Sequence, residues 1–76
     1  MSSDNMDEKE SELMHGMVNC YNTCHEDFEH TVHMVAAARM LTEEKVKSVL
    51  KKIKAESGNS KEYLSLRSKL PEDFPI

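Results

Sequence analysis

At 76 residues, the chain is long enough for one small domain, and a domain of this size buries only about 60% of the surface that its unfolded chain exposes. Its two glycines and two prolines are too few for the turns of a strand-rich fold. The net charge of −4 excludes a dominant basic surface, and with it broad binding to nucleic-acid phosphates.

The first residues of the chain and its two cysteines favour a cytoplasmic location. Residues 1–8 are acidic where a secretory signal would be basic, and no later apolar run approaches the roughly 18 residues that span a bilayer. We therefore expect a cytoplasmic protein without a membrane segment. In a reducing compartment, Cys20 and Cys24 are expected to be free thiols.

Charge is distributed unevenly along the chain. Residues 1–30 contain eight acidic residues and one basic residue, whereas residues 31–76 contain nine basic and six acidic residues. The two halves should therefore attract one another, either within one chain or between chains.

The first periodic segment predicts an amphipathic helix over residues 7–40, after a disordered N-terminus at residues 1–7. Apolar side chains recur at intervals of three and four, the spacing of one helix face, over about seven turns. Gly16 costs about 1 kcal/mol relative to alanine and can mark a bend or a frayed first turn. The apolar face includes Leu13, Met17, Tyr21, Phe28, Val32 and Val35.

Capping residues predict two further helices. Thr42, followed by two glutamates, is a favourable helix start, and Gly58 is expected to end this second helix near Ser57. Ser60 can then cap a short third helix over residues 61–69.

Pro71 separates the third helix from a C-terminal tail, residues 71–76, which is expected to be extended. The tail carries Phe74 and Ile76, which disordered tails usually lack, so we expect it to contact the body of the protein or a partner. The short connections predict a helical hairpin with a third small helix. The whole chain, residues 1–76, is therefore expected to form one all-α domain.

The densest group of chemically reactive side chains lies between residues 20 and 33. Cys20 and Cys24 are four residues apart, so their thiols should point the same way and could chelate Cu(I) or Zn²⁺. A closed zinc site needs four ligands, however, and the chain has no other cysteine. Two small apolar side chains filling the helix face are the alternative interpretation.

Four further candidate ligands should lie on the opposite face of the same helix. Glu26 and Glu29 precede His30 and His33 by four residues each, an arrangement that could hold Zn²⁺ or Ni²⁺. The same residues also suit a solvated face with weak pairing between glutamate and histidine. The thiols and this polar face point apart, so a single ion could not be held by both.

No catalytic motif is recognisable, and we expect neither enzymatic activity nor a cofactor or small-molecule substrate. The second and third helices could be read as a helix-turn-helix unit. Its lysines would lie on the wrong helix, however, and only Arg67 and Lys69 on the third helix suit base edges. Binding to nucleic acid is therefore a minor alternative.

The remaining hypothesis is a small protein–protein interaction module, a regulator or adaptor. The apolar face over residues 7–40 is about seven turns long, whereas the second helix has about four turns and the third about two. Part of that face would then lack cover, and bare apolar surface usually marks an interface. We expect its six apolar residues to dock on a partner protein or on a second copy in a homodimer.

Overall fold

The computed structural model describes residues 6–76, which form four helices and irregular connections without a strand. The helices are α1 (Glu8–Cys24), α2 (Phe28–Arg39), α3 (Glu43–Ser57) and α4 (Lys61–Arg67). The prediction of an all-α fold is confirmed. Residues 1–5, part of the segment expected to be disordered, lie outside the described residues, while Met6 is buried in the core.

The helix expected over residues 7–40 is divided into two, which corrects its predicted length. His25 ends α1 in the left-handed conformation, with its N–H donated to the carbonyl of Tyr21 at 2.7 Å. Two residues later the Asp27 side chain accepts from the N–H of His30 at 2.8 Å and begins α2. An aspartate that caps a new helix competes with continuation of the old one, which explains the break.

The later helix boundaries follow the predicted caps. The Thr42 hydroxyl accepts from the N–H of Lys45, and that of Ser60 accepts from the N–H of Tyr63, each at 3.0 Å. Gly58 ends α3 as expected but keeps a right-handed conformation. A Cβ atom there would collide with the carbonyl oxygen of Lys54, so glycine is needed for this close approach.

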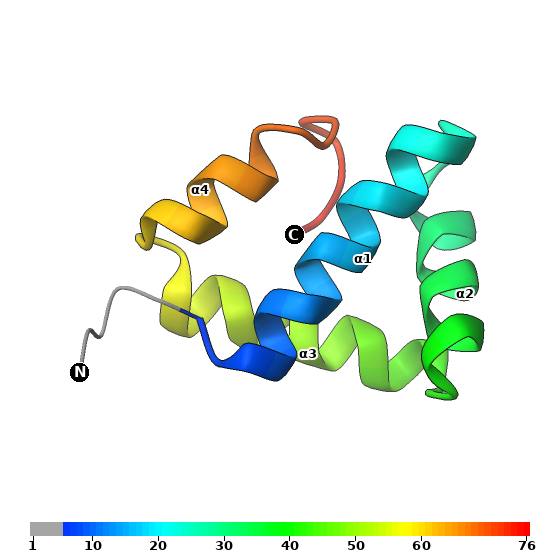
Figure 1. Cartoon of the computed structure of the whole chain (residues 1–76), viewed down its shortest axis with the longest axis horizontal. Helices are drawn as coiled ribbons and strands as arrows, with labels where there is room; N and C mark the ends of the chain where they lie inside the picture. Colours follow the sequence, from blue (N-terminus) through cyan, green and yellow to red (C-terminus); the bar gives the residue numbers. More distant parts are fainter. Residues whose placement is uncertain (1–5) are drawn as a thin grey trace.

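Helix α1 lies in the middle of the molecule and contacts each of the other three helices (Figure 1). Helix α2 lies on one side of it and α4 on the other, while α3 crosses beneath (Figure 1). The space between them is filled by one hydrophobic core. Its largest fully buried apolar side chains are Met14, Met17, Leu50, Ile53, Val32 and Val46.

The C-terminal tail folds back between α1 and α4 (Figure 1), which confirms that it contacts the body of the protein. It is not extended as expected, because it forms a turn in which the N–H of Phe74 donates to the carbonyl of Pro71 at 3.1 Å. The rings of Tyr21 and Phe28 meet the buried Phe74 ring edge-on, at centroid distances of 5.3 and 5.6 Å. The Arg67 guanidinium donates to five main-chain carbonyls, those of Leu70, Pro71, Glu72, Phe74 and Ile76. The tail is therefore a part of the core.

We predict that Phe74→Ala lowers the free energy of unfolding by about 3 kcal/mol, because it empties the centre of the aromatic cluster. The matched control is Leu64→Ala on α4, where the side chain is 53% exposed and the loss should stay below about 1 kcal/mol. Urea denaturation followed by circular dichroism measures both. Equal losses in the two variants would contradict a structural role for the tail.

Candidate interaction surface

The face that was expected to lack cover lies mostly inside the protein. Leu13, Met17, Val32 and Val35 are buried, while Tyr21 and Phe28 are partly buried against the core. Because α3, α4 and the tail close over this face, it does not need a partner, and the expectation of a bare stripe is corrected. Leu13 and Val35 nonetheless also line surface grooves, so an interaction surface would combine a small part of this face with other residues.

The two thiols lie in the last turns of α1, Cys20 partly buried and Cys24 exposed. Burial raises the pKa of Cys20, and the neighbouring Cys24 thiol raises it further. Within residues 6–76, no group of three or more histidine, cysteine, aspartate or glutamate side chains is arranged to hold a metal ion.

The four polar residues considered as metal ligands do not meet in one site within residues 6–76. Glu26 lies in the connection between α1 and α2, and His30 is exposed on α2. Glu29 pairs with Lys47 at 2.8 Å, and the His33 Nδ1 atom lies 2.9 Å from a carboxylate oxygen of Glu43. The last two contacts join α2 to α3, so these side chains support helix packing.

The basic residues considered for nucleic-acid binding are also partly occupied within the chain. Arg67 is committed to the tail, as described above. On α3, Lys47 pairs with Glu29, and Lys52 lies 3.9 Å from Glu10. Of the two residues considered for base edges, Arg67 is therefore engaged within the chain, whereas Lys69 takes part in no ion pair within residues 6–76.

Among residues 6–76, three of the four large apolar side chains that remain exposed lie in or just after α2. Met34 is 42% exposed, Leu41 is 40% exposed and Met40 is 93% exposed. We call these three residues the α2-end patch. No sequence pattern marks these residues as a site, because exposure at a helix end depends on how the next helix packs.

Met40 occupies a conformation that is unfavourable for methionine. Its φ of 57° places it in the left-handed region at the end of α2, where the N–H of Leu41 bonds to the carbonyl of Ala36 at 2.8 Å. Helix ends of this kind usually carry glycine, because a Cβ atom costs about 1 kcal/mol or more in this region. The site therefore combines backbone strain with an almost fully exposed apolar side chain.

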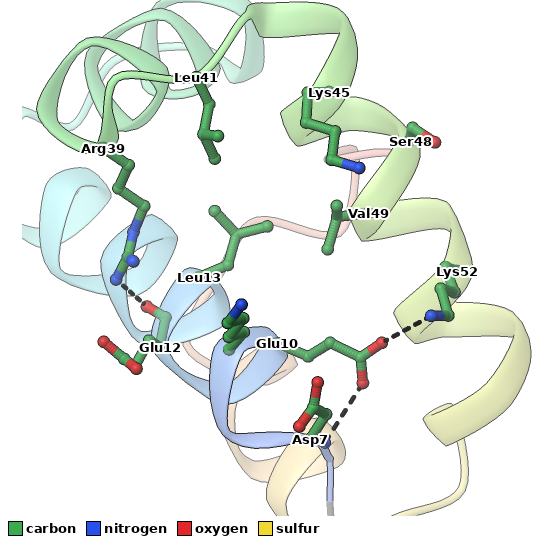
Figure 2. Close-up of a pocket in the computed structure, with 11 residues that line it drawn as sticks. Asp7, Glu10, Glu12, Leu13, Arg39, Leu41, Lys45, Ser48, Val49 and Lys52 are labelled. Atoms are coloured by element: carbon green, nitrogen blue, oxygen red, sulfur yellow. Dashed lines mark hydrogen bonds and ion pairs between the residues drawn. The ribbon is translucent and has the colours of Figure 1, made fainter.

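A groove of about 630 Å³ lies between α1 and α3, beside the α2-end patch (Figure 2). Its apolar floor is formed by Leu13, Leu41 and Val49, whose side chains point into the space between the helices. Charged side chains surround the floor. From α1 and its N-cap these are Asp7, Lys9, Glu10 and Glu12, and from α2 and α3 they are Arg39, Lys45 and Lys52.

A second groove, of about 570 Å³, lies between α1 and α2. Gly16, Cys20, Met34 and Ala38 contribute to its lining, and Arg39 lines both grooves. The Arg39 Nη2 atom donates to the main-chain carbonyl of Glu12 at 2.8 Å. Arg39 therefore lies where the two grooves adjoin, and Leu41 and Met34 of the α2-end patch line the first and the second groove. The two grooves and the α2-end patch together form one surface.

None of the helices in residues 6–76 is long and apolar enough to cross a membrane. Comparison of the chain with protein-family models, curated proteins and solved structures gave no match.

We predict that Met40→Gly raises the free energy of unfolding by about 1 kcal/mol, because glycine adopts the left-handed conformation without strain. The matched control is Ala38→Gly on the exposed side of α2, which should lower the same quantity by about 1 kcal/mol. Both are measured by urea denaturation. Destabilisation by Met40→Gly would show that the methionine makes contacts that stabilise the monomer.

We further predict that Cys24 reacts with iodoacetamide faster than Cys20. Burial raises the pKa of Cys20 above its ordinary 9.0, so less of the reactive thiolate is present at neutral pH. The single variants Cys20→Ser and Cys24→Ser isolate the two rates, which mass spectrometry measures. In urea the two rates should become similar; equal rates in the folded protein would contradict the prediction.

Proposed function

We propose that this protein is a protein-binding module, a small regulator or adaptor, whose recognition surface consists of the α2-end patch and the two adjoining grooves. The proposal depends on Met40, whose backbone is in the unfavourable left-handed conformation and whose side chain is 93% exposed. Strained residues persist where function requires them, and large exposed apolar patches mark interfaces.

The energetic argument concerns what the folded chain gains from Met40. Its side chain is 93% exposed and therefore contributes little burial, while its conformation costs about 1 kcal/mol or more. Glycine would remove this cost, so methionine at this position is unfavourable for the isolated protein. Contact with a partner would supply the missing burial, about 1.5–3 kcal/mol for one large apolar side chain.

The chemistry of the surface suits a protein partner. Methionine side chains are flexible and adapt to irregular apolar surfaces. The neighbouring groove adds an apolar floor with charged side chains around it, the arrangement of a protein–protein interface with a dry centre and a polar rim. The charged rim would orient the partner, and the floor would contribute most of the affinity.

We test the proposal by comparing three immobilised proteins, the wild type, Met40→Gly and Leu64→Ala, in an extract of the cells that produce the chain. Quantitative mass spectrometry identifies proteins that bind the wild type, and calorimetry measures each purified candidate. We expect at least one binder, which can be a second copy of the chain, to lose about tenfold in affinity with Met40→Gly. Leu64→Ala should bind as the wild type does.

This design separates binding from folding, because Met40→Gly is expected to be more stable than the wild type. A loss of binding in the more stable variant cannot result from unfolding. If no binder distinguishes Met40→Gly from the wild type, the α2-end patch is not a recognition surface and the proposal is wrong.

A further inference from the structure

We propose that the groove between α1 and α3 is occupied by a second copy of this chain, in a twofold-symmetric dimer. This inference rests on the proposed function and names its partner. The charges along the two sides of the groove carry it.

The two sides of the groove differ in sign. The α1 side presents the carboxylates of Asp7, Glu10 and Glu12 together with Lys9, and Arg39 of α2 lies beside Glu12, whereas the α3 side presents Lys45 and Lys52 (Figure 2). The first side thus has three acidic and two basic groups, and the second has two basic groups. Lys52 approaches Glu10 across the groove at 3.9 Å. Elsewhere the two sides remain apart, and within residues 6–76 neither Glu12 nor Lys45 takes part in an ion pair.

This arrangement restricts the partner. A uniformly acidic segment would be repelled by the α1 side, and a uniformly basic segment by the α3 side. The partner must carry both signs, on opposite sides of an apolar strip. The groove itself has this pattern, with the Leu13, Leu41 and Val49 side chains between the two charged sides.

A twofold axis can make two copies of this groove complementary in charge. In an isologous dimer the same patch serves both subunits, so that a contact between two different residues occurs twice. With the symmetry axis along the groove, the acidic side of each copy faces the basic side of the other, and the floors meet. The carboxylates on the α1 side of each copy then face Lys45 and Lys52 of the other.

The α2-end patch gives this dimer an apolar anchor. Met40 directly follows Arg39 and precedes Leu41, both of which line the groove. Met40 is not among the residues that line either groove, and its exposed side chain is available for contact with the other copy. One interface would then bury the strained methionine and cover the groove floor.

We test the dimer by sedimentation equilibrium at micromolar concentrations, with two charge reversals and one control. Glu12→Lys and Lys45→Glu should each weaken the dimer about tenfold, because each reverses one charge on a side that faces the opposite charge, and twofold symmetry makes this occur twice. Lys51→Glu reverses a lysine that lies on α3 but does not line the groove, and should have a much smaller effect. Circular dichroism verifies that each variant folds.

The decisive measurement is an equimolar mixture of Glu12→Lys and Lys45→Glu. In the mixed dimer the two reversed sides face each other, so opposite charges meet again and affinity should return to nearly the wild-type value. A wild-type protein that remains monomeric, or a mixture that associates no better than its components, overturns the proposed dimer. In that case a different binder that loses affinity with Met40→Gly would still support the proposed function.

Discussion

The guanidinium group of Arg67 holds the C-terminal tail against the body of the protein, and the closed core depends on that contact. Its five main-chain acceptors all lie between residues 70 and 76. The tail could not satisfy these carbonyls by regular secondary structure, because it is short and contains two prolines. Held in this way, Phe74 reaches Tyr21 and Phe28 and covers the break between α1 and α2.

The position of the tail determines which apolar surface remains exposed. With α3 and α4, the tail covers most of the face that α1 and α2 turn inward, and a chain of only 76 residues closes a core without a partner. The end of α2 lies away from the tail and keeps Met34, Met40 and Leu41 exposed. The interaction surface is therefore the part of the molecule that no other segment covers.

Stability and recognition oppose each other at that surface. Glycine at position 40 would relieve the backbone, yet it would remove the most exposed apolar side chain among the described residues. A small domain has little stability to lose, and about 1 kcal/mol is a considerable part of it. If binding depends on methionine at position 40, the stability lost to its backbone strain is offset by the affinity gained. Active sites show the same exchange of stability for activity.

Local features of the sequence determined the class of the fold and most helix boundaries. Thr42 and Ser60 each cap a helix through their own side chain, so the breaks near residues 41 and 59 can be read without knowing the fold. The break at residues 25–27 was missed because apolar spacing of three and four continues through it. Asp27 is visible as a possible cap, but only the packed structure shows that capping prevailed there over helix continuation.

The candidate surface required the tertiary structure. Periodicity identifies which residues share a helix face, but it does not say whether another segment covers that face. Leu13 and Met17 are buried because α3, α4 and the tail close over them, whereas Met40 is bare because nothing among residues 6–76 reaches it. The groove likewise joins side chains from α1, α2 and α3 that are up to 45 residues apart, from Asp7 to Lys52. Such proximity results from how whole helices pack together, and no local pattern in the chain encodes it.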